Sequence, residues 1–480
     1  MFPDLISRGG FIRAAAVLAV GSAADTASAA RQGPARLRVG VLSDVHVGLA
    51  PKSADLFAKA LACFRERRVD AVIVAGDLTD TGLVPELENF AAAWRKVFPD
   101  GKGLDGQPVE KLFVWGNHDY NAWAWGGPEN AKKKYAQYEK INADFAGVWK
   151  RVFGEEYGEM WIKDVKGYKF VGCQYQRYPA SGPDADFLER HRGELAGSKP
   201  FFYIQHYHPK GTAPYADEDG GASTKALSRF PNAVAFTGHS HTTLVDDRTI
   251  WQGEFTSVGT ASLHDIIPFG GRENSFTCGG ADPYVPQMPS VWWGHYHHGM
   301  LMTVYDDRIV LERRDFANDI PLAADWVIPL PFDGSLRTEI REPKAPVPQF
   351  PDGAAVTVSD VKGKDRAGVE REQKVVSFPN VFAKDGARPF DFTVSVEVAT
   401  QDAHCIHLTK AVYSPRFCFG EAADEKTVTC VFSKDELPKA MKMWGSVVPA
   451  PKGRSFRFVV CPRNCYGRKG KPILSAWMSK

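Results

Sequence analysis

The chain has little net charge and no long hydrophobic run. Its 59 Lys and Arg residues nearly balance 57 Asp and Glu residues, giving a net charge of +2 over 480 residues. This balance provides no general electrostatic attraction to nucleic acid or to an anionic membrane surface. Low-complexity segments and internal repeats are also absent, and 44% of the residues are hydrophobic, which argues against general disorder. The sequence therefore predicts a globular protein of two or three domains whose partners are selected at local sites.

The first 29 residues differ in composition from the rest of the chain. Two arginines precede a short apolar run at Ala14–Val20, and small residues follow at Ala27–Ala29. The run is far shorter than the roughly 20 residues that cross a bilayer, so we expect a cleaved signal peptide at 1–29 and no transmembrane anchor. Ser7–Arg13 resembles a twin-arginine signal in which Gly9 replaces the second arginine. The protein is thus expected to be periplasmic or secreted.

Cysteine is scarce before residue 400. Three of the eight cysteines precede this position and five follow it. Cys63 and Cys173 lie within apolar patterns, which predicts small buried side chains rather than reactive thiols. In an exported protein any disulfides would belong to the region after residue 400, where an odd number leaves at least one thiol without a local partner.

Residues 37–240 alternate short apolar runs with longer amphipathic segments. This pattern predicts an α/β fold. Strands are expected within 37–43, 70–77, 111–117, 168–174, 200–206 and 233–239, and helices at 53–67, 84–97, 129–146, 184–196 and 222–229. Polar residues follow the strands, at the position where an open α/β sheet binds its ligands.

The region after residue 320 has a different pattern. Seven prolines from Pro321 to Pro351 exclude a continuous helix or a central strand, and we expect an extended linker at 321–351. Beyond it, the period-two alternation of Phe390–Val398 predicts an antiparallel β-sandwich at 352–480. This smaller all-β domain would be a structural appendage or a contact to an envelope component. The basic residues within 463–471 predict a solvated turn.

Five short motifs rich in Asp, Asn and His stand where the predicted strands end. They are Asp44-Val45-His46, Gly76-Asp77-Leu78-Thr79-Asp80, Gly116-Asn117-His118-Asp119, His206 and Gly238-His239-Ser240-His241. A single Asp after a strand is usually a helix cap, and a single His is usually structural. Together, however, these oxygen and nitrogen ligands suit two divalent transition metals, and the lack of cysteine argues against a closed thiolate zinc site.

This order of motifs (DxH, GDxxD, GNHD, H and GHxH) resembles that of the calcineurin-like metallophosphoesterases. The resemblance covers residues 44–241, and the domain is expected at 36–320. It implies a sandwich of two β-sheets flanked by helices, with two divalent metal ions (Mn, Fe or Zn) and attack on a phosphate ester by a metal-bridging hydroxide. The implied ligands are Asp44, His46 and His241 for one ion, Asn117, His206 and His239 for the other, and Asp77 as the bridge.

The resemblance also implies a catalytic pair. His118 would protonate the leaving group, and Asp80 would accept a hydrogen bond from it and raise its pKa, although a helix cap is the alternative for Asp80. Asp119 is expected to hold the turn. The sequence QHYHP offers two candidates for one ligand. We favour His206 because it directly follows the strand, which leaves His208 as a supporting or substrate contact.

The sequence departs from two related subgroups. Purple acid phosphatases carry a tyrosine ligand where Asp80 stands, so that subgroup is excluded. Phosphoprotein phosphatases carry an arginine where Thr81 stands, so a dedicated phosphoprotein phosphatase is not expected. Among the remaining phosphomonoesterases and phosphodiesterases, we expect a small extracytoplasmic phosphate ester as substrate. The alternative is a non-catalytic envelope- or glycan-binding protein whose metal site is structural.

Aromatic side chains follow the GNHD motif and could form part of a substrate pocket. Tyr120, Trp123 and Trp125 could stack on a base or a sugar, or pack under the expected helix 129–146. The segment that contains Trp292 could contribute further aromatic surface.

Overall fold

The computed structural model describes most of the chain after residue 32. The described residues are 33–125, 127, 133–175, 185–214, 218–267, 271–275, 296–365, 368–381, 387–399, 404–415, 426–437, 440–443, 446–449 and 455–479. The predicted signal peptide at 1–29 lies outside them, as do Cys278, Cys418 and Trp292. Within the described ranges, no helix combines the length and the apolar character needed to cross a membrane.

Two β-sheets pack face to face in residues 37–329, here called the N-terminal sandwich. The first contains β1 (Leu37–Leu42), β2 (Ala71–Ala75), β3 (Glu110–Val114), β10 (His298–Val304), β11 (Arg308–Asp315), β12 (Ile320–Pro321) and β13 (Trp326–Pro329). The second contains β4 (Met160–Val165), β5 (Tyr168–Cys173), β6 (Phe201–Ile204), β7 (Ala233–Thr237), β8 (Ile250–Gln252) and β9 (Thr256–Gly259). Apolar side chains of both sheets, among them Val39 and Phe202, form one buried core.

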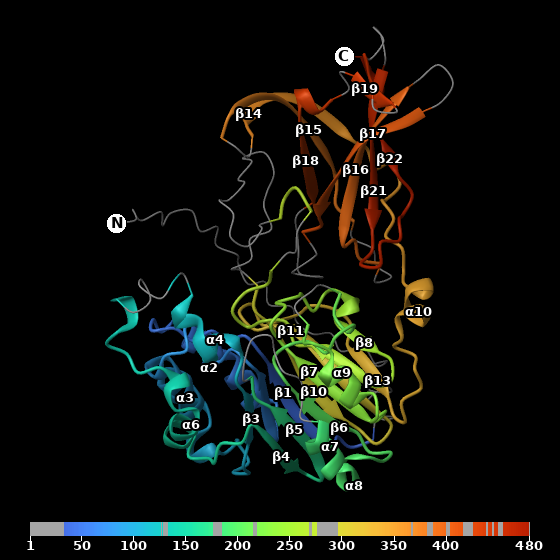
Figure 1. The fold of residues 1–480 in the computed structure, drawn as a ribbon. Helices are drawn as coiled ribbons and strands as arrows, with labels where there is room; N and C mark the ends of the chain where they lie inside the picture. Colours follow the sequence, from blue (N-terminus) through green and yellow to red (C-terminus); the bar gives the residue numbers. More distant parts are fainter. Residues whose placement is uncertain are drawn as a thin grey trace.

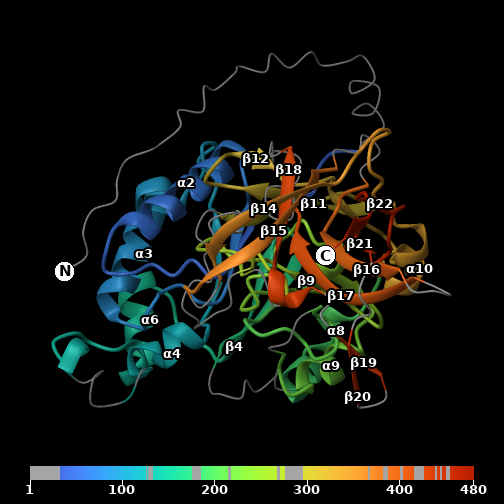
Figure 2. The same ribbon diagram turned by 90° about the horizontal axis from the view of Figure 1, so that it is seen from above.

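Helices cover the outer face of each sheet. α2 (Lys52–Glu66), α3 (Val84–Val97) and α6 (Phe145–Phe153) pack on the first sheet, and α7 (Ala185–Arg190), α8 (Arg192–Leu195) and α9 (Ala222–Leu227) on the second. Seen from above, α2 and α3 lie on the opposite side of the molecule from α8 and α9 (Figure 2). Phe57, Leu61 and Phe64 are the buried face of α2, at the spacing of an amphipathic helix. The predicted sandwich of two sheets flanked by helices is confirmed.

The sheet order brings the sequence motifs to one end of this sandwich. The first sheet runs β12–β11–β10–β1–β2–β3, with β13 also paired to β11, and the second runs β4–β5–β6–β7–β9–β8. β1, β2 and β3 are parallel, and so are β5, β6, β7 and β9. The carboxyl ends of parallel strands meet at one edge, so the segments after β1, β2, β3, β6 and β7 gather there.

The predicted continuous helix at 129–146 is wrong over residues 133–146, while 129–132 lie outside the described residues. Lys140 forms an isolated β-bridge with Leu83, and Ile141 N–H donates to Gly82 O at 3.0 Å. These long-range backbone bonds hold Lys140 extended and interrupt the helix that the periodicity favoured. α6 begins only after Asp144, whose carboxylate accepts from Gly147 N at 2.9 Å as an N-cap.

Short helical turns complete this region and the connection that follows it. They are η1 (Pro99–Gly101), α4 (Asn117–Asn121), η2 (Ala122–Ala124), η3 (Ile141–Ala143), η4 (Asp247–Thr249), α10 (Thr338–Arg341) and η6 (Glu342–Lys344). The segment 321–351 is therefore not a linker throughout, because β12 and β13 pair with β11 and α10 follows them. Both strands lie at a sheet edge, where proline is tolerated.

Residues 357–479 form a second, all-β body, here called the C-terminal sandwich. One sheet contains β14 (Thr357–Lys364), β15 (Glu370–Pro379) and β18 (Thr427–Ser433), and the other contains β16 (Asp391–Ala399), β17 (His404–Tyr413), β21 (Ser455–Arg463), β22 (Ile473–Leu474) and β23 (Met478–Ser479). β19 (Ala440–Met443) pairs with β20 (Ser446–Pro449), and η8 spans Lys434–Glu436. The Phe378 and Phe392 rings lie 5.1 Å apart across a shared core, which confirms the antiparallel sandwich.

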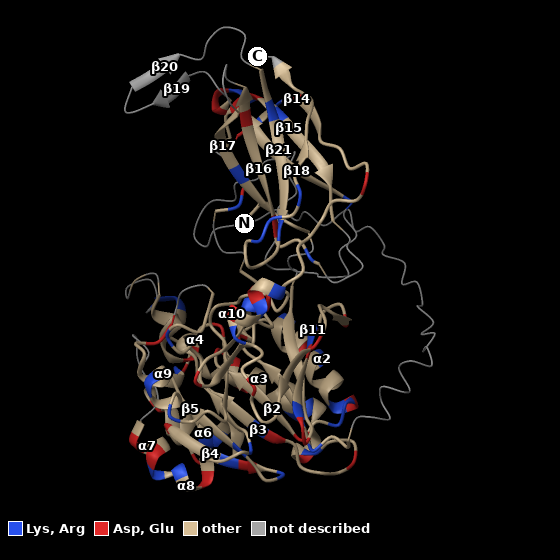
Figure 3. Ribbon diagram, turned by 90° about the vertical axis from the view of Figure 1, so that its right-hand side faces the viewer, with Lys and Arg blue, Asp and Glu red and all other residues tan. Residues whose placement is uncertain are grey.

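Figure 1 shows the C-terminal sandwich standing above one end of the N-terminal sandwich, with α10 beside the junction. Positive and negative residues are interspersed over both bodies, in line with the small net charge (Figure 3). Cys63, Cys405, Cys461 and Cys465 are free thiols.

Candidate metal centre

The seven predicted metal ligands meet at the carboxyl ends of five strands. Six of them, together with the predicted catalytic His118, fall into three overlapping groups whose ligand atoms lie within 4.8 Å of one another: Asp44, His46 and His241; His46, Asp77 and His118; and Asp77, His206 and His239. Asn117 joins them, with its Oδ1 2.8 Å from His206 Nε2. Asp77 and His46 each belong to two groups, so the arrangement is continuous. Its centre is Asp77, the predicted bridging ligand.

The backbone at this end adopts conformations that most residues avoid. Five of the predicted ligands have left-handed φ angles: Asp44 (49°), His46 (46°), Asp77 (52°), His239 (67°) and His241 (48°). Each such residue costs on the order of 1–3 kcal/mol and persists only where its surroundings hold it in place. Strained backbone conformations cluster at functional sites, so these φ angles indicate a functional site at this end of the sandwich.

Glycines in the motifs let the ligands approach the neighbouring backbone. A Cβ on Gly116 would lie 2.1 Å from Asp77 Oδ1, and a Cβ on Gly238 would lie 2.4 Å from Asp44 Oδ2. Any side chain at these positions would displace a buried carboxylate. The glycines of GNHD and GHxH are thus required by packing around the ligands.

The hydrogen bonds of His206 leave an acceptor nitrogen pointing at other acceptors. His206 Nδ1 lies 2.8 Å from the backbone oxygen of Ala75, which can only accept, so Nδ1 carries the proton. In the neutral ring, Nε2 then carries a lone pair and can only accept a hydrogen bond. The atoms nearest to it are also acceptors, Asn117 Oδ1 at 2.8 Å and Asp77 Oδ2 at 3.1 Å. Lone pairs that converge in this way fit a cation.

The same reasoning applies to His241 on the other side of Asp77. Its Nδ1 lies 2.7 Å from Asp265 Oδ1 and donates to this carboxylate. Its Nε2 therefore faces Asp44 Oδ1 at 3.0 Å and His46 Nε2 at 3.4 Å as an acceptor. A carboxylate that fixes the tautomer of a histidine is the usual support for a metal ligand. The residues present fit two divalent ions.

The charges of the cluster are strongly coupled. Burial raises the pKa of Asp44, but His241 and His206 outweigh it and lower that pKa to about 2. Burial lowers the pKa of His206, whereas the Asp77 and Asp44 carboxylates raise it to about 9. Protonated histidines thus neutralise the buried carboxylates, and divalent ions bound at the same positions would replace those protons.

The predicted contact between the Asp80 carboxylate and His118 is wrong. His118 Nδ1 lies 2.6 Å from the backbone oxygen of Asp80, while the carboxylate lies 3.6 Å from His46 Nδ1. Burial lowers the pKa of His118, opposite to the expected rise. The backbone carbonyl fixes the His118 tautomer and leaves Nε2, 4.0 Å from Asp77 Oδ2, facing the centre. The Asp80 carboxylate supports His46 instead.

Two neighbouring residues have structural contacts. Asp119 is fully buried and accepts from the backbone N–H groups of Leu78, Thr79 and Gly116, which confirms that it holds the turn. His208 is buried with its ring nitrogens 2.8 Å from the Thr237 and Ser240 hydroxyls. This geometry does not support the predicted substrate contact of His208, and it favours His206 as the ligand.

The aromatic residues after GNHD separate into different environments. Tyr120 packs on Phe145, with ring centroids 5.5 Å apart, and belongs to the helix-covered core. Trp123 lies under Lys140, whose Nζ is 5.8 Å from the ring. Trp125 is 51% exposed and meets the His118 ring edge-on at 4.5 Å. Of these three, Trp125 is the one placed beside the predicted catalytic histidine.

Two residues at the centre were missed by the sequence reasoning. Asp265 supports His241, and the His264 ring lies 5.2 Å from the His46 ring. Both follow β9, which runs parallel to β7. The signal that could have found them is a His-Asp pair shortly after a short apolar run, the same arrangement as in GNHD.

Residues 37–243 match the family described as calcineurin-like phosphoesterase. No curated protein matches the chain. Among solved structures, a dimetal phosphatase from Danio rerio is 13% identical, with a TM-score of 0.38 over 62% of this chain and 100% of its own. GAP50, the anchor in the inner membrane complex of Plasmodium, is 13% identical, with a TM-score of 0.34 over 61% of this chain and 88% of its own.

These structural similarities are distant, so the assignment rests on the family match together with the ligand geometry. The matched span contains every one of the five motifs and ends shortly after His241. Residues 37–243 are a calcineurin-like phosphoesterase domain, and the chain is a metal-dependent phosphoesterase.

Proposed function

We propose that the protein is a binuclear-metal hydrolase of small phosphate esters, either monoesters or diesters, acting outside the cytoplasm. The observation that supports this most is the convergence of lone pairs from His206 and His241 on the two buried carboxylates Asp44 and Asp77. Such a donor set suits Mn, Fe or Zn. The extracytoplasmic location is inferred from residues 1–29.

Each predicted ligand has a place in this proposal. Asp44, His46 and His241 would hold one ion, Asn117, His206 and His239 the other, and Asp77 would lie between them. When bound, the two ions supply positive charge to the phosphoryl oxygens and lower the pKa of water. The chain itself orients the ligands, through Asp265 on His241, the Ala75 carbonyl on His206 and Asp80 on His46.

His118 is the group proposed to act on the leaving oxygen. Its side chain is 24% exposed, so a substrate can reach it, and the Asp80 carbonyl fixes its Nδ1. Nε2 faces the centre and can carry the proton that the leaving group needs. Asp77 Oδ1 accepts from the His118 backbone N–H at 2.8 Å, which holds the His118 backbone beside the predicted bridging ligand.

Trp125 is the proposed contact for the organic part of the substrate. Its exposed ring stands edge-on to His118, so a flat leaving group could stack on it while its oxygen meets Nε2. The small net charge offers no basic track for a polyanion, which favours a small ester over nucleic acid. A glycan or envelope contact through the C-terminal sandwich stays a prediction.

The first test is hydrolysis by the full chain freed of metal and then supplied with Mn²⁺, Fe²⁺ or Zn²⁺. We expect release of p-nitrophenol from its phosphate or from its bis ester, and no release without metal. A screen of nucleotides, cyclic nucleotides, sugar phosphates and lipid head groups, ranked by kcat/KM, then identifies the substrate class. Absence of hydrolysis of every ester with every metal would overturn the proposal.

A further inference from the structure

The segment Ser262–Ser275 runs from the metal centre to the C-terminal sandwich. It follows β9, so it leaves the sheet at the same end as the ligands. Its described parts are 262–267 and 271–275. The matched family span ends at residue 243, before this segment begins. Its contacts therefore add to those of the family motifs.

The first part of the segment lies against two metal ligands. His264 N–H donates to Asp44 O at 3.0 Å, and Ile267 N–H donates to His241 O at 3.1 Å. Asp265 accepts from His241 Nδ1 at 2.7 Å and is 5% exposed. Asp44 and His241 belong to the same ligand group, so this part of the segment supports one of the two predicted ion sites.

The second part of the segment is bound to the C-terminal sandwich. Glu273 N–H donates to Ala411 O at 2.7 Å, and the Asn274 side chain both donates to Tyr413 O and accepts from Tyr413 N, at 3.1 and 2.7 Å. Tyr413 is fully buried and belongs to the core of the N-terminal sandwich. This side of the junction is thus packed as a protein interior.

A buried ion cluster fixes the same contact. Asp391 is 1% exposed and accepts from Arg272 at 3.0 and 2.9 Å and from Arg463 at 2.7 and 2.6 Å. A carboxylate buried between two guanidinium groups is costly to leave without a partner. Arg463 was predicted to lie in a solvated turn, and this contact shows that prediction to be wrong.

The C-terminal sandwich is also held at a second place. Arg468 Nη1 donates to the carbonyl oxygens of Pro343 and Ala345, each at 2.8 Å, and Asn464 Nδ2 donates to Pro346 O at 3.0 Å. These bonds bind the connecting segment after α10 to the loop after β21. The connecting segment is thus bound to the C-terminal sandwich in addition to the contact at Arg272.

The distance between the two anchored parts is short. Four Cα steps separate Ile267 from Gly271, which span at most about 14 Å even when fully extended. Asp265 and Arg272 are therefore held on closely spaced parts of the chain, one against the metal centre and the other against the C-terminal sandwich.

We propose that the C-terminal sandwich positions the metal centre through this segment, with Arg272, Asp391 and Asp265 as positioning residues. The inference rests on the proposed function only in that the centre binds divalent ions. Asp265 holds the His241 ring so that Nε2 points at the ion site, and the junction with the C-terminal sandwich holds Asp265. The second body is thereby a working part of the phosphoesterase site.

The test measures binding of Mn²⁺ to the metal-free full chain by calorimetry, and the absorption spectrum of the Co²⁺ form. Asp265→Asn should weaken one of the two Mn²⁺ sites by about 10–100-fold, the usual effect of losing a partner of a metal-bound histidine. Arg272→Gln should weaken the same site by a smaller factor and alter the same Co²⁺ bands. The double variant should bind no more weakly than Asp265→Asn alone, because both act through one contact.

Matched variants keep the test decisive. Asn274→Ala removes a different anchor and should act like Arg272→Gln, whereas Arg36→Gln breaks an exposed Arg–Asp pair at the far end of the sandwich and should leave Mn²⁺ binding unchanged. Circular dichroism shows that each variant is folded. Unchanged Mn²⁺ binding in both anchor variants, or additive effects in the double variant, would overturn the inference.

The same measurements distinguish failure of the proposed function from failure of this inference. A wild type that binds Mn²⁺ but hydrolyses no ester overturns the proposed function, while the binding series still decides this inference. A wild type that hydrolyses esters while both anchor variants bind Mn²⁺ normally overturns this inference alone. A wild type that binds no Mn²⁺ overturns both.

Discussion

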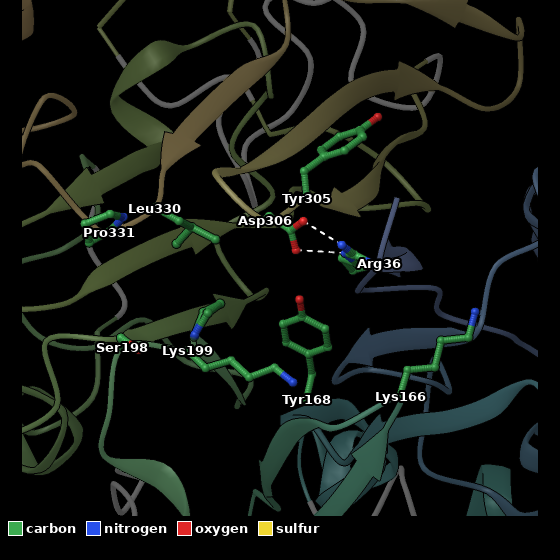
Figure 4. Close-up of a pocket in the computed structure, with 10 residues that line it drawn as sticks. Arg36, Lys166, Tyr168, Ser198, Lys199, Tyr305, Asp306, Leu330 and Pro331 are labelled. Carbon is green, nitrogen blue, oxygen red and sulfur yellow. Dashed lines mark hydrogen bonds and ion pairs between the residues drawn. The ribbon is translucent and has the colours of Figure 1, made fainter. Parts of the chain in front are cut away.

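The two ends of the N-terminal sandwich differ in how their polar groups are satisfied. At the carboxyl ends of the parallel strands, Asp44 and Asp77 are buried among histidines whose lone pairs converge. At the opposite end lies a cavity of about 570 Å³ (Figure 4), lined by Arg36, Lys166, Tyr168, Ser198, Lys199, Pro200, Tyr305, Asp306, Leu330 and Pro331. The second end is hollow and charged, but its charges have partners of their own.

Each of the three positively charged side chains that line this cavity has a partner. Arg36 forms a bidentate pair with Asp306 at 2.8 and 2.7 Å (Figure 4), Lys166 pairs with Asp70 at 2.5 Å, and Lys199 lies 3.9 Å from the centre of the Tyr168 ring. The groups of potential metal ligands found among the described residues all lie at the other end. The comparison teaches that converging lone pairs, rather than a large cavity, mark the site.

The largest expected effect contrasts the two ends of one strand. Asp77 follows β2 and Asp70 precedes it. Asp77→Asn removes a carboxylate from two ligand groups, so we expect loss of bound metal and of hydrolysis together. Metal content by mass spectrometry and the rate on p-nitrophenyl phosphate check this. Asp70→Asn is the matched control, and an equal loss there would contradict the contrast.

The next effect separates chemistry from metal binding. His118→Ala should keep both metals but lower kcat by about 10²–10⁴-fold for an alkyl phosphate, because a poor leaving group needs a proton. The loss should be much smaller for p-nitrophenyl phosphate, whose leaving group needs little protonation. His191→Ala, an exposed histidine paired with Glu194, is the control. An equal loss for both esters would exclude His118 as the general acid.

A third effect tests the packing of glycine against the bridging ligand. Gly116→Ala would place a Cβ 2.1 Å from Asp77 Oδ1, so we expect weakened metal binding and a loss of about 1–3 kcal/mol in the free energy of unfolding. Gly197→Ala meets no atom within 4 Å and should change that free energy by less than about 0.5 kcal/mol. Denaturant titration with and without Mn²⁺ measures both. Normal metal binding in Gly116→Ala would show that the ligand cluster tolerates displacement.

The smallest effect concerns substrate contact. Trp125→Ala should raise KM for an aryl phosphate by about 2–10-fold, equivalent to about 0.5–1.5 kcal/mol of aromatic contact, with little change in kcat. Trp477→Ala alters an exposed tryptophan of the C-terminal sandwich and should have no effect on KM. If the aryl and alkyl esters respond equally to Trp125→Ala, stacking on this ring is not the cause.

Much of the site could be predicted from local sequence. A polar motif at the end of each short apolar run placed Asp44, Asp77 and Asn117 at one edge, because parallel strands end together. The position at the end of the predicted strand favoured His206, which lies two residues after β6, and the buried hydroxyl contacts of His208 agree with that choice. These features depend on where each strand ends, which the apolar periodicity locates.

The remaining features depend on contacts between distant segments. The Asp80 carboxylate turns to His46 rather than His118, and the backbone bonds between residues 139–141 and 82–84 interrupt the expected helix. Asp265 lies outside the five motifs, and Asp391 meets Arg272 over a separation of 119 residues. No local pattern encodes such pairs, since each partner alone is compatible with a solvated side chain.

The central claim is that five strand ends hold two divalent ions that drive phosphoester hydrolysis. Its most direct test is a titration of the metal-free full chain with Mn²⁺ while hydrolysis of bis(p-nitrophenyl) phosphate and of p-nitrophenyl phosphate is followed. We predict no hydrolysis without metal and a rise that levels off once two equivalents are bound. Hydrolysis that is independent of metal, or absent for both esters after two ions have bound, would contradict the claim.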